Sequence, residues 1–63
     1  MNNRIVVRLV GDAGKIRELA EKINDLMVDN GLVIIEHGEP KDHKAGDKQI
    51  FITGLDLQEN GVA

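Results

Sequence analysis

The sequence predicts an α+β fold of the order β-α-β-β, with one amphipathic helix on one face of a three-stranded, mostly antiparallel sheet. Three observations lead to this prediction. Three short runs rich in β-branched residues are spaced as strands. One segment repeats apolar residues at three- and four-residue intervals, as helices do. With 63 residues the chain has room for a single domain, 1–63.

The first strand is expected at about residues 4–10. Its core, Ile5 to Val10, is rich in β-branched residues and is followed by the turn signal Gly11-Asp12. Alternation along the strand places Ile5, Val7 and Leu9 on one face of the sheet and Arg4, Val6, Arg8 and Val10 on the other.

The helix is expected at about residues 12–29. Asp12 suits the N-cap because its carboxylate can accept from the first free amides and lies at the positive end of the helix dipole. Asn30-Gly31 is the stop signal, since both residues tolerate the left-handed conformation that closes a helix. The apolar residues expected to form the buried stripe are Ile16, Leu19, Ala20, Ile23, Leu26 and Met27.

Two further strands are expected at about 32–37 and 48–53, with a loop at 38–47 between them and a tail at 55–63. Two sheet arrangements are compatible with this order. The first and second strands can be parallel neighbours, with the third strand on an edge. Alternatively, the third strand lies between them and is antiparallel to both. We favour the second arrangement because Ile50-Phe51-Ile52 is apolar on both faces, as a central strand requires.

One helix can cover only one face of this sheet, yet both faces carry apolar residues. The surplus residues, which we expect at a homodimer interface, are Val6, Val10, Val33, Ile35 and Phe51. Self-association suits the size of the chain, because so small a domain buries only about 60% of its unfolded surface. No Cys is present, so disulfides cannot supplement the core. Scattered exposed valines, or a different partner on this face, are the alternatives.

The loop at 38–47 is polar, carries no large apolar side chain and is longer than a typical hairpin connection. Long loops in compact domains are often functional. We therefore expect this loop to bind a partner protein, through Glu39, Lys41, Asp42, His43, Lys44 and Asp47. A solvated connector without a partner is the alternative.

The chain contains few side chains of the types that carry out catalysis. There is no Cys, and Thr53 is the single hydroxyl side chain, so nucleophilic catalysis is not expected. His37 and His43 are the candidate general bases, and with their acidic neighbours they match no established metal-ligand spacing. The glycines of Gly11-Asp12-Ala13-Gly14-Lys15 are too close for a phosphate-binding loop, and Ile16 stands where that loop has Ser or Thr. We expect no metal, no cofactor and no enzymatic activity.

Composition also limits the partners. Eight Lys and Arg against eleven Asp and Glu give a net charge of -3, with both signs interspersed. Nucleic-acid binding is not expected, because it requires a basic patch, and the single aromatic residue, Phe51, offers no stacking platform. The apolar run at Ile5–Val7 is too short for a signal peptide, and no segment reaches transmembrane length. We expect a cytoplasmic protein without a membrane partner.

The layout of Ile5 to Thr53 resembles that of short, uncharacterised β-α-β-β proteins of Gram-positive bacteria and their phages and prophages. The resemblance is carried by Pro40 and Gly46 in the loop and by the closing strand Lys48-Gln49-Ile50-Phe51-Ile52-Thr53. It implies a small accessory protein that binds and inhibits a host protein. The predicted function is therefore a non-enzymatic, homodimeric protein-binding module of phage or prophage type. A small metabolite- or anion-binding domain that uses the loop and the turn at Gly11 is the alternative.

Overall fold

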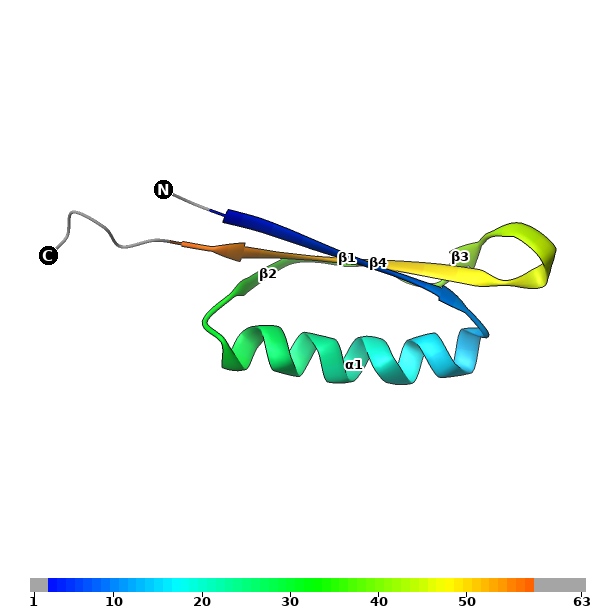
Figure 1. The fold of residues 1–63 in the computed structure, drawn as a ribbon, viewed down its shortest axis with the longest axis horizontal. Helices are drawn as coiled ribbons and strands as arrows, with labels where there is room; N and C mark the ends of the chain where they lie inside the picture. The colour runs from blue at the N-terminus through cyan, green and yellow to red at the C-terminus, as the bar shows by residue number, and fades with distance from the viewer. Residues whose placement is uncertain (1–2, 58–63) are drawn as a thin grey trace, which may run out of the picture.

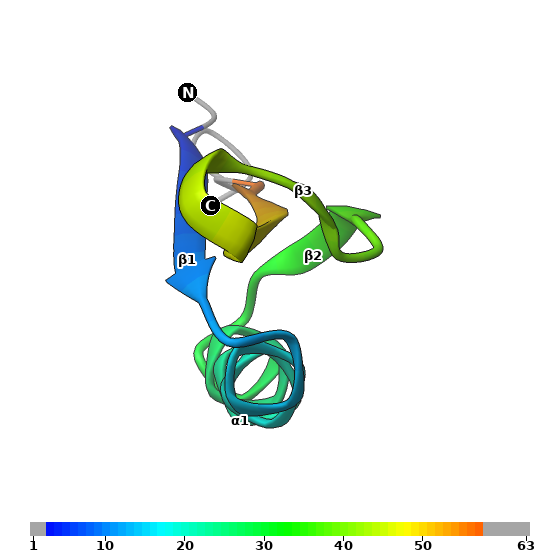
Figure 2. The same cartoon turned by 90° about the vertical axis from the view of Figure 1, so that its right-hand side faces the viewer.

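The computed structural model describes residues 3–57 and places one helix against one face of an antiparallel sheet (Figure 1). The elements in chain order are β1 (Asn3–Gly11), α1 (Ala13–Asp29), β2 (Val33–His37), β3 (Lys41–Asp42), a 3-10 helix (Lys44–Gly46) and β4 (Lys48–Asp56). Figure 2 looks along the helix and shows α1 on one side of the sheet. The predicted α+β class is confirmed, with the two-residue β3 added to the three expected strands.

β4 lies in the centre of the sheet, between β1 and β2. Both neighbours are antiparallel to it, which confirms the favoured arrangement. The nine residues of β1 all pair with β4, from Asn3 opposite Asp56 to Gly11 opposite Lys48. The structure thus extends the predicted strand at 48–53 to Asp56 and places Leu55 in the sheet rather than in the tail. Residues 58–63 of that predicted tail lie outside the described part of the chain.

The two ends of α1 are closed by local hydrogen bonds, as the sequence predicts. At the start, Asp12 has extended backbone angles and its Oδ2 accepts from the backbone amide of Lys15 at 3.1 Å. At the end, Gly31 adopts a left-handed φ of 86°. The amide of Leu32 then donates to the Met27 carbonyl, and that of Gly31 to the Val28 carbonyl, each at 3.0 Å. This pair of bonds is a Schellman motif, and it satisfies carbonyls that a bare helix end would leave free.

The core lies between α1 and the face of the sheet that α1 covers. Its buried residues are Ile16, Ala20, Met27, Ile50 and Ile52, with Val7, Leu9, Ile23, Leu32 and Ile34 packed against them. Gly54 allows the closest approach of helix and sheet. A Cβ atom at Gly54 would lie 2.6 Å from Met27 Cε and 3.3 Å from Leu32 Cδ1. The C-terminal end of α1 therefore rests directly on the backbone of β4.

Leu26 is a member of the predicted stripe that the structure leaves outside the core, since it is 61% exposed. The reason is angular. At about 100° per residue, the helix positions that pack in the core span an arc of about 60°, whereas Leu26 lies about 80° from Ile16. This flank of α1 faces solvent.

The predicted loop at 38–47 contains a two-residue strand, β3, and a 3-10 helix, so the expectation of a plain loop is corrected at those residues. Lys41 pairs with Gln49 and Asp42 with Lys48, so β3 continues the edge on which β2 lies. Between them, the amide of Gly38 donates to the Phe51 carbonyl at 2.8 Å. Gly and Pro residues made this segment look like a loop.

The hairpin turn itself is confined to His43–Asp47. The amide of His43 donates to the Asp47 carbonyl at 2.9 Å, and the amide of Asp47 donates to the Lys44 carbonyl at 3.0 Å. Ala45 and Gly46 have positive φ values of 56° and 81°, which reverse the chain within these few residues. Figure 1 shows this turn projecting beyond the N-terminal end of α1.

Candidate functional site

The face of the sheet opposite α1 is here called the open face. Strand alternation and the pairing register assign to it Arg4, Val6, Arg8 and Val10 of β1, Gln49, Phe51, Thr53 and Leu55 of β4, and Val33, Ile35 and Glu36 of β2. Figure 2 shows α1 on the other side of the sheet. The open face is therefore outside the helix-covered core.

The open face holds all five residues predicted for a homodimer interface. Their exposed fractions run from 39% for Phe51 to 54% for Val6, with Val10, Val33 and Ile35 between these limits. For the second strand, the sequence predicts Val33 and Ile35 at this interface. In the structure Leu32 and Ile34 pack against the core, and Val33 and Ile35 are exposed.

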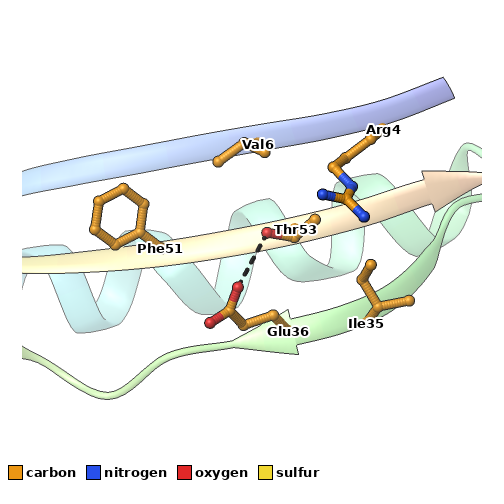
Figure 3. Close-up of a pocket in the computed structure, with 6 residues that line it drawn as sticks. All are labelled: Arg4, Val6, Ile35, Glu36, Phe51 and Thr53. Atoms are coloured by element: carbon orange, nitrogen blue, oxygen red, sulfur yellow. Dashed lines mark hydrogen bonds between the residues drawn. The ribbon is translucent and has the colours of Figure 1, made fainter.

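A β-bulge turns an acidic side chain onto the open face. Ile34 pairs with Gly54, but the next paired residue of β2 is Glu36, opposite Thr53. Ile35 is thus the extra residue of the bulge. Strict alternation would have put Glu36 on the same face as Ile34, toward the helix. Instead, Thr53 Oγ1 donates a hydrogen bond to Glu36 Oε1 at 3.3 Å (Figure 3).

A shallow depression of about 530 Å³ lies around this hydrogen bond. Its lining residues, drawn in Figure 3, are Arg4, Val6, Ile35, Glu36, Phe51 and Thr53. Thr53 is 6% exposed, and its hydroxyl is satisfied by the hydrogen bond that it donates to the Glu36 carboxylate. The other lining side chains are exposed. The depression is therefore open to solvent.

The cationic side chains of the open face stand on β1. Arg8 Nε donates to Gln49 Oε1 at 3.2 Å, and the guanidinium carbon lies 6.0 Å from the centre of the Phe51 ring. This contact is at the outer limit of a cation–π interaction. Within residues 3–57, no ion pair joins Arg4, Arg8 or Glu36 to another side chain. The charges of the open face are therefore not neutralised by pairing inside the described protomer.

The residues predicted to bind a partner protein gather at the hairpin of β3 and β4. His43 is half-buried. The exposed members of the set are Glu39, Lys41, Asp42, Lys44 and Asp47. Asp42 already has a role in the fold, because its carboxylate pairs with Lys48 Nζ. The hydrogen bond and the charge of Lys48 lower the pKa of the Asp42 carboxyl.

The structure gives the alternative sites less support. Within residues 3–57, no group of three or more His, Asp or Glu side chains is placed to hold a metal ion. His37 is exposed on β2, and His43 is half-buried in the hairpin turn. At the turn after β1, the carboxylate of Asp12 caps α1 itself and opposes the binding of an anion there.

The sequence did not mark Arg4, Arg8 or Thr53 as candidate site residues, and it placed Glu36 only among the acidic neighbours of His37 and His43. Period-two alternation already placed the two arginines on the face away from the core, so their location on the open face could be predicted from the sequence. The location of Glu36 could not be predicted, because it depends on the bulge at Ile35.

Comparison with protein-family models, with curated proteins and with solved structures found no match for the chain. In the part of the chain that the structure describes, no helix combines the length and apolar character needed to cross a bilayer.

Proposed function

We propose that the protein is a non-enzymatic, cytoplasmic protein-binding module that works as a homodimer, with the open face as the dimer interface. One observation carries the proposal. Five large apolar side chains lie together on the sheet face that α1 does not cover, and each is 39% exposed or more. Contiguous apolar surface on a small domain is typical of interaction sites.

The small core supports the same proposal. Among residues 3–57, five apolar residues are buried, and two of them, Ile50 and Ile52, are the largest fully buried side chains. A body of this size gains much from added burial, because small domains remove a smaller share of their surface from water than large ones do. Stacking two open faces would enclose β4 of each copy between two layers.

We also propose that the hairpin of β3 and β4 contacts a second, different protein. Lys41 and Lys44 are exposed there, and the turn projects beyond α1 (Figure 1). The resemblance to short phage and prophage proteins suggests that this partner is a host protein that the dimer inhibits or modulates. Charged side chains at an interface rim mainly set encounter rate and specificity.

The test of dimerisation compares one substitution on the open face with one elsewhere. Phe51→Glu places a charge in the proposed interface, where an unpaired charge is costly, and should give monomer, unfolded chain or both. Leu26→Glu is the matched control, since Leu26 is 61% exposed on α1. It should leave the mass in sedimentation equilibrium and the circular dichroism spectrum unchanged.

Wild-type behaviour decides the case even if Phe51→Glu does not fold. A dimer should unfold at a temperature that rises with protein concentration, because association is linked to folding. A wild-type chain that sediments as a folded monomer at high concentration would refute the homodimer. Saturable stabilisation of such a monomer by a small anion or metabolite would favour the alternative function.

A further inference from the structure

The open face has charges of opposite sign on its two edges. Arg4 and Arg8 lie on β1, and Glu36 lies on β2, with β4 between them. The register fixes their heights along the strands. Glu36 and Val6 both pair with Thr53, so Glu36 is level with a point midway between the two arginines. Each arginine is two residues from that level, or about 7 Å along the strand.

Two copies can stack their open faces around a two-fold axis in either of two directions. An axis across the strands would lay β1 of one copy over β1 of the other. Arg4 and Arg8 of one copy would then face Arg4 and Arg8 of the other copy. These like charges would repel each other, with no acidic side chain between them. An axis along the strands lays β1 of one copy over β2 of the other, and so brings opposite charges together.

We propose that two copies of this chain stack with the two-fold axis along β4, so that Glu36 of each copy lies between Arg4 and Arg8 of the other. The proposal rests on the homodimer proposed above and specifies its geometry. Sheets packed face to face lie about 10 Å apart with strand directions within about 30° of each other. Arginine and glutamate side chains together span that gap and the offset along the strand.

The side chains are held in positions that favour this contact. The Thr53 hydroxyl occupies Glu36 Oε1, which leaves Oε2 for a guanidinium. Gln49 holds Arg8 by its Nε, which leaves the terminal nitrogens of the guanidinium for a carboxylate. Close to the axis, Phe51 of one copy meets Phe51 of the other. Aromatic residues at the centre of an interface are typical anchors.

Charge reversal at each end of the proposed pair tests the geometry. Glu36→Arg brings three arginines together, and Arg8→Glu brings two carboxylates together, in each case twice in the symmetric dimer. We expect each variant to raise the dimer dissociation constant by about tenfold to a hundredfold, since reversal replaces attraction by repulsion at both symmetric contacts. The readout is analytical ultracentrifugation.

Mixing the two variants gives the sharper result. In a heterodimer, Glu36 of the Arg8→Glu chain meets the native arginines of the other chain. On the opposite side, the new arginine at position 36 meets the new glutamate at position 8. We expect the heterodimer to form in preference to both homodimers, in native mass spectrometry of an equimolar mixture. The double variant Arg8→Glu with Glu36→Arg should recover the wild-type constant to within a few-fold.

Two controls separate charge from folding. Glu36→Gln keeps an oxygen for the Thr53 hydroxyl but removes the charge, so it should weaken the dimer less than Glu36→Arg. Arg17→Glu reverses an exposed charge on α1 and should leave the dissociation constant unchanged. Circular dichroism confirms that each variant is folded.

The outcomes distinguish this geometry from the dimer itself. A dimeric wild type whose dissociation constant is insensitive to Glu36→Arg and Arg8→Glu, or a mixture without preferred heterodimer, would overturn the geometry and leave the homodimer standing. A monomeric wild type would overturn both and leave the open face to a different partner.

Discussion

The Thr53 hydroxyl on β4 donates a hydrogen bond to the Glu36 carboxylate on β2 over 3.3 Å. Thr53 is 6% exposed whereas Glu36 is exposed, so the contact ties a surface charge to the buried centre of the sheet. The bond also secures the bulge, because Glu36 reaches Thr53 only when Ile35 is left without a partner in the ladder.

The first prediction is energetic coupling between these two residues. A double-mutant cycle of Thr53→Val and Glu36→Ala should give a coupling free energy of about 0.5–1.5 kcal/mol, the usual net value of a protein hydrogen bond. Urea unfolding at fixed protein concentration measures it. Additive effects of the two substitutions would show that the bond contributes nothing to stability.

The second prediction concerns the approach of α1 to β4 at Gly54. A Cβ atom there would lie 2.6 Å from Met27 Cε, so Gly54→Ala should destabilise the protein by about 1–3 kcal/mol, as overpacking does. The end of the methionine side chain can move, and for this reason the lower part of that range is expected. Gly14→Ala is the control, because its Cβ would meet Asp12 Oδ2 at 3.4 Å, an ordinary contact. A neutral Gly54→Ala in thermal unfolding would contradict this packing.

The third prediction concerns pH. Lys48 holds the pKa of the Asp42 carboxyl below its ordinary value of 3.8, first by a hydrogen bond and then by its charge. Because the pKa is lower in the folded state, the pair stabilises the hairpin above about pH 4 and loses this contribution as the pH falls through the lowered pKa. Lys48→Gln should raise the Asp42 pKa toward its ordinary value in an NMR titration, and Lys44→Gln should not. An unchanged Asp42 pKa in Lys48→Gln would refute the pair.

The fourth prediction separates the hairpin from the dimer. Lys41 and Lys44 are exposed, and within residues 3–57 neither forms an ion pair. Reversing both to Glu should change the free energy of unfolding by less than about 0.5 kcal/mol, as surface substitutions usually do, and should not affect dimerisation. Binding of a partner protein through the hairpin should weaken, more strongly at low salt where charges are less screened. A loss of stability would show that the hairpin turn supports the fold.

The long elements could be predicted from the sequence because each has a strong local signal. The central position of β4 follows from Ile50-Phe51-Ile52, which is apolar on both faces. The ends of α1 follow from Asp12 and Gly31. The Asp12 carboxylate accepts a hydrogen bond from a free amide at the start of the helix, and Gly31 adopts the left-handed φ at its end without steric cost. The placement of Val6 and Val10 on one face of β1, and of Phe51 on the face of β4 opposite Ile50 and Ile52, follows from period-two alternation within each strand.

The rest depended on contacts that have no local signal. The bulge at Ile35 lies within a run of apolar residues that fits regular alternation equally well, and no glycine marks it. β3 has only two polar residues, and its pairing with β4 was hidden by Gly38 and Pro40 on its N-terminal side. In both cases the partner strand decides the conformation.

The central place of β4 also governs the order in which the sheet can assemble. β4 is the last described strand in the sequence, yet both β1 and β2 pair with it. β2 and β3 reach β4 through a tight turn, so this hairpin closes at little entropic cost. β1 can pair only after β4, which lies far along the sequence, has been synthesised, and pairing over such long separations is slow. During synthesis, β1 and α1 leave the ribosome before the strand that covers their apolar side chains exists. In that interval their apolar side chains stay exposed to water.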